Sequence, residues 1–267
     1  MIFRILFFIV VMVPFMIVAL PIQFVLTRLN LPGWNVLPRL FHRLACIFVG
    51  LRVRVIGQPN AGKPTLITAN HISWTDIIAI GAVADVSFVA KQDVSGWPMV
   101  GFMASLQKTI YVDRTRRTDA RRTSAEMGLR MAGGGSVLLF AEGQSDIGTH
   151  VLPFRTALVG AAQHAMMEAG ARDVAVQPLT IAYTHLQGLP VSRNERSLIA
   201  WIGSRTPREN IREILSGGVR DVTVAFGLPR PLDPEDDRKA ITRMAEADVR
   251  RMLVALNRGL PLPELTR

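Results

Sequence analysis

Residues 5–27, ILFFIVVMVPFMIVALPIQFVLT, contain no charged side chain, and this run limits what the chain can fold into more than any other feature. An apolar stretch of about 20 residues is long enough to cross a bilayer as a helix. Pro14 and Pro21 would kink that helix, so a bent hairpin lying in the membrane interface is an equally open interpretation. A cleaved signal peptide is disfavoured, because the run exceeds the usual apolar core of a signal.

Basic residues dominate the N-terminal part of the chain. The net charge is +10, and no Asp or Glu precedes Asp76. Such a balance indicates an anionic partner, either nucleic acid or a phospholipid surface. Because the excess lies beside the apolar run and few aromatic residues are available for base stacking, we expect anionic membrane lipids and no nucleic acid. The positive-inside bias predicts that the rest of the chain lies on the cytoplasmic side of the inner membrane.

A second helix is expected within residues 36–55, where Arg39, His42 and Arg43 are spaced among apolar side chains before the pattern becomes strand-like. This spacing favours a helix on the membrane surface with its arginines at anionic headgroups. A core helix with a solvated cationic face is the alternative. We therefore assign residues 1–57 to an N-terminal membrane anchor, made of an apolar and an amphipathic helix, and residues 58–267 to one main domain.

Strand-like and helical patterns alternate through the main domain. The strand-like runs are residues 66–69, 86–90, 109–112, 136–141, 174–183 and 221–227, and the helical ones are residues 75–84, 119–133, 155–170 and 235–256. This alternation predicts an α/β fold with a largely parallel sheet flanked by helices. Residues 193–211 are interpreted as a surface excursion with a short helix. The single cysteine, Cys46, excludes an internal disulfide framework.

Residues 57–65, GQPNAGKPT, match the first seven positions of the phosphate-binding loop G-x-x-x-x-G-K-[ST]. The eighth position is Pro64, which has neither a hydroxyl for magnesium nor an N–H for phosphate. We interpret this segment as a polar turn between two strands.

His71 and Asp76 lie five positions apart in TANHISWTDI, residues 68–77, between two apolar runs. Inside one helix that offset rotates by about 140°, so the two side chains would diverge. They converge if His71 lies on the turn before a helix and Asp76 in its first turn. The carboxylate then accepts a hydrogen bond from one ring nitrogen and leaves the other as a base. Ser73 or Thr75 is expected to cap the helix. A capping aspartate beside a satisfied histidine is the alternative.

Four blocks, taken in order, resemble the glycerolipid acyltransferase family, the lysophosphatidic acid acyltransferases of membrane lipid synthesis. They are H-x-x-x-x-D at His71–Asp76, an arginine after an apolar strand at Tyr111–Arg114, FAEG at Phe140–Gly143, and a proline-containing apolar strand at Val176–Leu179. The resemblance covers about residues 60–185. It implies that residues 58–267 form an acyltransferase domain, which transfers a fatty acyl group from acyl-CoA or acyl carrier protein to the hydroxyl of a lysolipid. Neither a metal nor another cofactor is implied.

The resemblance also implies roles for individual residues. His71 would be the general base and Asp76 would orient it, while Arg114, Glu142, Gly143 and Arg155 would hold the acceptor lipid. No G-x-S-x-G motif is present, which disfavours a hydrolase. A non-enzymatic membrane-bound lipid-binding protein is the competing class, and such a protein would not need this polar cluster.

The third block departs from the family pattern. FAEG replaces F-P-E-G, and Ser145 stands where the family commonly has an arginine that would face phosphate. The altered block is more similar to the branch that acylates lyso-ornithine lipid, whose headgroup is an amino acid. Lyso-ornithine lipid and lysophosphatidic acid both remain open as acceptors. Residues 114–122, RTRRTDARR, are a candidate contact for the phosphates of coenzyme A or the acidic face of acyl carrier protein, or else a solvated helix start.

Overall fold

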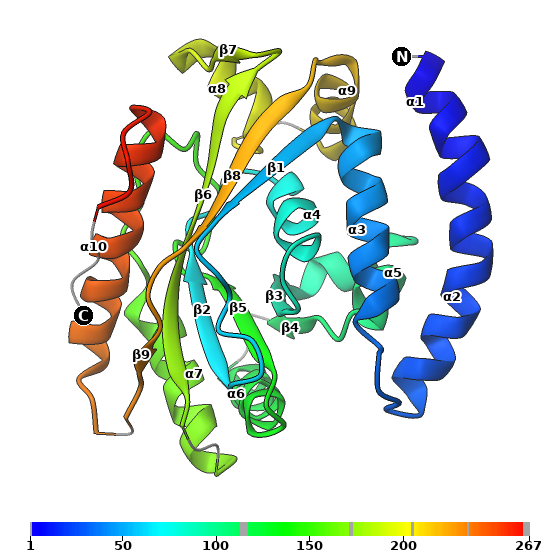
Figure 1. The fold of residues 1–267 in the computed structure, drawn as a ribbon. Coiled ribbons are helices and arrows are strands. Elements are labelled where there is room, and N and C mark those ends of the chain that lie inside the picture. The colour runs from blue at the N-terminus through cyan, green and yellow to red at the C-terminus, as the bar shows by residue number, and fades with distance from the viewer. Residues whose placement is uncertain (1, 113–116, 171–172, 204–205, 234, 264–267) are drawn as a thin grey trace.

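A mixed sheet separates two helical layers in the computed structural model, which describes residues 2–112, 117–170, 173–203, 206–233 and 235–263 (Figure 1). Along the sheet the strands are β1 (Leu51–Ile56), β8 (Arg220–Phe226), β6 (Ala175–Leu186), β2 (Thr65–Ala69), β5 (Ser136–Phe140), β3 (Ser87–Lys91) and β4 (Ile110–Val112). Two short strands, β7 (Leu189–Pro190) and β9 (Arg230–Pro231), pair with β6.

The sheet is parallel from β6 through β2, β5 and β3 to β4. Strand β8 runs antiparallel to β6, and β1 is parallel to β8. The prediction of a largely parallel α/β fold is confirmed. The turn at residues 57–64 follows β1 and precedes β2, but these strands are not neighbours because β8 and β6 lie between them.

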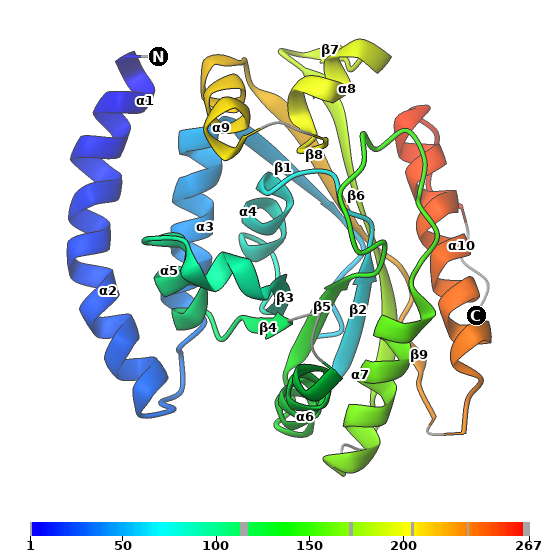
Figure 2. The same ribbon diagram turned by 180° about the vertical axis from the view of Figure 1, so that it is seen from behind.

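Helices cover both faces of the sheet, as Figures 1 and 2 show. One layer contains α3 (Val36–Val49), α4 (Thr75–Gly81) and α5 (Val100–Leu106), with the short helix η2 (Gln92–Gly96) beside α5. The opposite layer contains α6 (Arg117–Ala132), α7 (Thr156–Glu168) and α10 (Arg238–Asn257). The sheet is therefore covered on both faces, as parallel sheets generally are.

Strand β2 lies near the middle of the sheet and is buried along its whole length. Ile67 and Ala69 join the core beneath α4, whereas Leu66 joins the core that contains Val159 of α7. Alternate residues of a strand point to opposite faces, so β2 contributes to both cores. Because β2 is held in both cores, its end at Ala69 has a fixed position, and the turn that follows starts from there.

The N-terminal segment is helical from Ile2 to Arg28, through α1 (Ile2–Phe7), the π-helical turn η1 (Phe8–Met12) and α2 (Val13–Arg28). Within the described residues it is the one helix long and apolar enough to cross a membrane, a criterion that core helices and signal sequences also meet. Its surface is mostly exposed. The sheet begins before the boundary assigned at residue 57, because β1 pairs with β8.

Both ends of this apolar helix contact the rest of the protein. Near the start, the Arg4 guanidinium donates to the carbonyl oxygens of Ile214 and Leu215. Near the end, Nε2 of the buried Gln23 donates to the carbonyl oxygen of Leu106 over 2.9 Å and to that of Trp34 over 2.8 Å. The helix therefore lies alongside α3 instead of projecting away from the domain (Figure 1).

The excursion at residues 193–211 contains more structure than the sequence pattern predicted. Helix α8 (Arg193–Ile199) begins with a capping box between Ser192 and Glu195, and α9 (Pro207–Ser216) begins with one between Thr206 and Glu209. Each box pairs a hydroxyl with a glutamate three residues later. These two S/T-x-x-E patterns were the overlooked signal for a second helix.

Candidate active site

His71 lies on the turn between β2 and α4, and its ring reaches Asp76 in the first turn of α4. The distance from His71 Nδ1 to Asp76 Oδ2 is 2.9 Å. The two side chains therefore converge in the geometry expected for a histidine before a helix and an aspartate inside it. An ionised carboxylate can only accept, so Nδ1 carries the proton and Nε2 carries the lone pair.

The carboxylate of Asp76 is fully buried and accepts further hydrogen bonds. Its Oδ2 also accepts from the backbone N–H groups of Ile72, over 2.6 Å, and Ser73, over 2.9 Å. Its Oδ1 accepts from the hydroxyl of Tyr183 over 2.8 Å. Buried charge is tolerated when it is well hydrogen-bonded, and these donors stabilise the ionised form of Asp76.

The prediction that Ser73 or Thr75 caps α4 is wrong. The N-cap residue is Trp74, which makes no side-chain cap hydrogen bond. Thr75 Oγ1 instead lies 2.6 Å from the Tyr183 hydroxyl, and because that hydroxyl donates to Asp76, Thr75 is the donor. Oγ of Ser73 is buried without a hydrogen-bond partner among the described residues.

The His71 ring is held on one face and remains partly exposed. Phe140, the last residue of β5, stacks on it with ring centroids 4.1 Å apart and an interplanar angle of 22°. The imidazole is 21% exposed, whereas Asp76 is fully buried. A reactant can therefore reach the histidine but not the aspartate that orients it.

Glu142, just beyond β5, binds the backbone of the neighbouring loops. Its Oε2 accepts from the His71 N–H over 2.7 Å, and its Oε1 accepts from the Leu152 N–H over 2.8 Å. Burial raises the pKa of this carboxyl to about 8, although the two N–H donors favour the charged form and limit the rise. Glu142 thus fixes the loop that carries the histidine.

Gly143 and Arg155 lie next to Glu142. Gly143 has a φ of 73°, a left-handed conformation that favours glycine. Arg155 is exposed, and its Nε donates to the carbonyl oxygen of Glu142 over 3.2 Å. Glu142 therefore contacts His71 directly, Gly143 follows it in the chain, and Arg155 contacts the backbone of Glu142. The fourth residue predicted to hold the acceptor lipid, Arg114, lies outside the described residues, and its role stays a prediction.

The loop after Gly143 approaches the histidine from another side. The Asp146 N–H donates to the His71 carbonyl oxygen over 2.9 Å, and the Asp146 carboxylate lies 3.6 Å from Nδ1 of His150. The Ser145 hydroxyl donates to the carbonyl oxygen of Trp201. Ser145, at the position of the family arginine, therefore points toward the segment after α8, and the acidic Asp146 follows it in the chain.

Sequence reasoning gave no role to Tyr183 or Phe140. Tyr183 lies far along the chain in β6, where a buried aromatic residue is ordinary core material. The only available signal was its hydroxyl, because a buried tyrosine usually needs a hydrogen-bond partner. Phe140 belongs to the FAEG block, but the sequence does not show that its ring stacks on His71.

The arrangement is suited to proton transfer. A partly exposed imidazole with a free Nε2 lone pair is oriented by a buried carboxylate, which also stabilises the imidazolium that forms when Nε2 takes a proton. The histidine–aspartate pair has the geometry of the base half of a catalytic triad. A hydroxyl supplied by a substrate would complete it.

Comparisons with known proteins match this chain to one enzyme family. Residues 52–182 match the family model described as Acyltransferase. The chain is 40% identical to a lyso-ornithine lipid O-acyltransferase of Brucella abortus over 98% of both chains. It is 36% identical to a 1-acyl-sn-glycerol-3-phosphate acyltransferase of Neisseria gonorrhoeae over half of each chain.

A solved structure has the same fold. It is the crystal structure of the 1-acyl-sn-glycerophosphate acyltransferase of Thermotoga maritima, with a TM-score of 0.61 and 21% identity. The similarity covers 84% of this chain and 79% of that one. At this identity the likeness shows the fold.

The raised pKa of Glu142 predicts a pH-dependent stability. A carboxyl whose pKa is higher in the folded protein contributes stability that is fully present below about pH 4.5 and is lost as pH rises to about 8. The free energy of unfolding of the parent should therefore fall relative to that of Glu142→Gln over this window, by about 5 kcal/mol. Urea unfolding at several pH values measures it. The exposed Glu168→Gln is the matched control, and a constant difference between parent and Glu142→Gln would contradict the prediction.

Proposed function

This chain belongs to the acyltransferase family, and from that premise we propose that it transfers a fatty acyl group from a thioester, acyl-CoA or acyl-acyl carrier protein, to the hydroxyl of a lysolipid. The observation that carries the proposal is the His71–Asp76 pair, with its 2.9 Å contact and its partly exposed imidazole. A lysolipid hydroxyl is a poor nucleophile at neutral pH, whereas a thioester is already activated. A positioned base therefore supplies what the reaction lacks.

In the proposed mechanism, Nε2 of His71 takes the proton of the acceptor hydroxyl as its oxygen attacks the thioester carbonyl carbon. The tetrahedral intermediate then collapses, the carbon–sulfur bond breaks, and the sulfur leaves as a thiol after taking the proton back from His71. Asp76 stabilises the imidazolium between these two steps. Such general-base catalysis accelerates reactions typically about 10²- to 10⁴-fold.

Replacement of His71 by alanine should abolish acyl transfer, with a loss of about 10²-fold or more, because no other base remains at that position. Asp76→Asn should be severe but leave residual activity, because asparagine still hydrogen-bonds but does not balance the imidazolium charge. Initial rates with a labelled acyl donor measure both. His164→Ala, which replaces an exposed histidine of α7, should keep the parental rate. Parental activity in His71→Ala would refute the general-base role.

For the acceptor, we propose lyso-ornithine lipid in preference to lysophosphatidic acid. The loop beside His71 presents Ser145 and the partly exposed Asp146 instead of a cation at the family's arginine position. A phosphate monoester carries about −1.5 to −2 charge and would be repelled by Asp146. The ammonium group of an ornithine headgroup would be attracted to the same carboxylate, and Arg155 remains available for its carboxylate. The high identity to the Brucella abortus relative supports this choice.

Separate substitutions of Asp146 and Ser145 should change the acceptor preference. Asp146→Asn should lower kcat/KM for lyso-ornithine lipid about tenfold, because it removes a charge-assisted contact, while activity on lysophosphatidic acid holds or rises. Ser145→Arg should shift preference toward lysophosphatidic acid. Asp173→Asn is the matched control, because Asp173 is exposed just before β6, at the opposite end of the parallel strands from His71. A strong parental preference for lysophosphatidic acid under one donor and one detergent would overturn the proposal.

We also propose that the protein is bound to the cytoplasmic face of the inner membrane, with the apolar helix lying in the interface. The helix is about 40 Å long at 1.5 Å per residue, and both of its ends contact the same domain through Arg4 and Gln23. A spanning helix would have to break one of these contacts. Exposed apolar side chains along it, such as Phe3, Ile9 and Ile17, are suited to insertion among acyl chains.

Single-cysteine labelling distinguishes the two membrane arrangements. The only native cysteine, Cys46, is buried, so new cysteines at Ile2→Cys and Leu29→Cys, both highly exposed positions, give the signal. An interfacial helix predicts that an impermeant maleimide labels both positions from the cytoplasmic side of vesicles. Labelling of the two ends from opposite sides would show a spanning helix. Washing membranes with high salt should not release the protein. Release by salt would show that electrostatic attraction to the lipids, and not insertion of the apolar helix, binds the protein to the membrane.

A further inference from the structure

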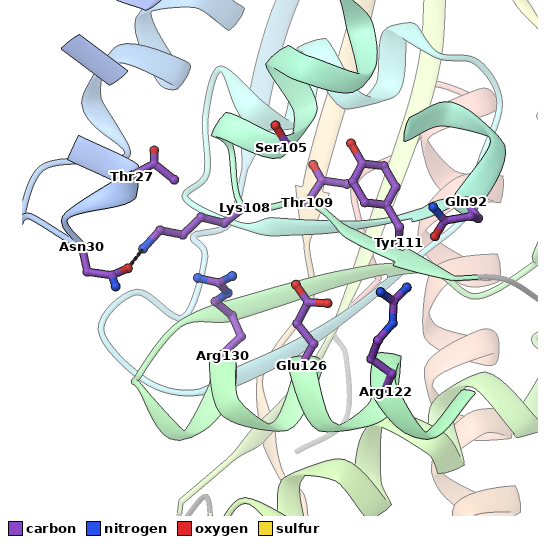
Figure 3. Close-up of a pocket in the computed structure, with 10 residues that line it drawn as sticks. All are labelled: Thr27, Asn30, Gln92, Ser105, Lys108, Thr109, Tyr111, Arg122, Glu126 and Arg130. Carbon is purple, nitrogen blue, oxygen red and sulfur yellow. Dashed lines mark hydrogen bonds between the residues drawn. The ribbon is translucent and has the colours of Figure 1, made fainter. Parts of the chain in front are cut away.

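A cavity lies away from His71, at the β4 edge of the sheet. It has a volume of about 460 Å³, within the range of small-molecule sites. Figure 3 shows its walls, which come from the end of α2, from α5, from β4 and from α6. In the sheet, β5 and β3 lie between β4 and the strand that ends at His71.

The charged side chains that line this cavity are mostly cations. Arg122, Glu126 and Arg130 are spaced four residues apart along α6 and rise from it on one face, toward β4, the strand that carries Tyr111 (Figure 3). Lys108 adds a third positive charge from the opposite wall. Three cations and one carboxylate leave a net positive charge, which an anionic ligand would balance.

Lys108 is held over the cavity by an unusual backbone. Its φ is 57°, a left-handed conformation that costs a non-glycine residue about 1 kcal/mol or more. The side chain extends to within 3.5 Å of Asn30 Oδ1 and lies over the Trp34 ring, 4.5 Å from its centroid. Burial and the Arg130 charge lower the pKa of Lys108. A bound anion would offset the repulsion between the Lys108 and Arg130 charges.

Arg130 is also incompletely satisfied. Its Nε is buried and has no hydrogen-bond partner in the described part of the chain. Burial lowers the pKa of Arg130, and the Glu126 carboxylate offsets part of this effect. A buried donor without a partner costs about 1 to 3 kcal/mol, so a ligand oxygen at this point would be stabilising.

Apolar side chains flank this cationic cavity. The end of α2 that supplies Thr27 exposes Val25 and Leu29, and α5, which supplies Ser105, exposes Phe102. Met99 and Val100, at the start of α5, are also exposed. Cations beside exposed apolar groups are typical of a site where a headgroup is bound and its acyl chains continue along the protein.

We propose that the cavity between α2, α5, β4 and α6 binds the phosphate group of an anionic phospholipid, with Lys108 and Arg130 as the main donors. The acyl chains lie along the exposed apolar side chains of α2 and α5. The lipid in this cavity is a bound partner and not the acyl acceptor, because the base is at the end of β2. Occupancy would tie the apolar helix to α6 at the membrane surface.

The test measures binding of full-length protein to vesicles, without any acyl transfer. Vesicles of phosphatidylcholine with or without phosphatidylglycerol are titrated with the parent, with Lys108→Asn/Arg130→Gln, and with Lys239→Asn/Arg243→Gln. The last pair removes the same charges from exposed positions on α10, on the opposite side of the sheet. Asparagine suits the left-handed conformation at position 108, which favours folding of that variant.

The cavity variant should lose about tenfold or more of the affinity for phosphatidylglycerol vesicles, while the α10 variant changes less than about threefold. Glu126→Gln, which removes the carboxylate, should bind these vesicles more tightly than the parent. Equal losses in the two double variants would show a general charge effect and overturn the proposal. Competition by coenzyme A at concentrations where glycerol 3-phosphate has no effect would instead assign the cavity to the acyl donor.

Discussion

The buried carboxylate of Asp76 is the interaction on which the site depends. It accepts from the His71 ring, from the N–H groups of Ile72 and Ser73, and from the Tyr183 hydroxyl. Each hydrogen bond to a charged group contributes about 1.5 to 3 kcal/mol, and an ionised carboxylate without them would not be stable in the core. These donors come from the β2–α4 turn and from β6, so one side chain joins the two elements.

Three acidic residues hold His71, each by a different group. Asp76 binds the ring, the Glu142 carboxylate accepts from the backbone N–H, and the Asp146 N–H donates to the backbone carbonyl oxygen. Two of the three lie in the loop after β5, the strand next to β2 in the sheet. Because β2 and β5 are parallel, their carboxyl ends meet at one edge, where α/β proteins commonly place their sites. The fold thus brings FAEG and NHISWTD together.

Sequence patterns predicted the local features of this site well and its long-range contacts poorly. The five-residue offset from His71 to Asp76 predicted a turn followed by a helix, because helical geometry leaves few ways for the pair to meet. The stacking of Phe140 and the hydrogen bond from Tyr183 depend on strand order, which the alternation of strands and helices does not specify. The antiparallel pairing of β8 with β6 was missed for the same reason. The expectation that Ser73 or Thr75 caps α4 followed the residue preferences of N-caps. In the structure, the Asp76 carboxylate instead accepts hydrogen bonds from the backbone N–H groups just before the helix.

The contact between Arg4 and the end of α9 has a consequence for the order of synthesis. Arg4 leaves the ribosome early, whereas Ile214 is made 210 positions later. At translation rates of about 5 to 20 residues per second, this end of the apolar helix waits roughly 10 to 40 s for its protein partner. In the proposed interfacial arrangement, the bilayer would cover the apolar helix during that interval. The rest of the domain would then complete its folding at the membrane surface, around a helix already bound there.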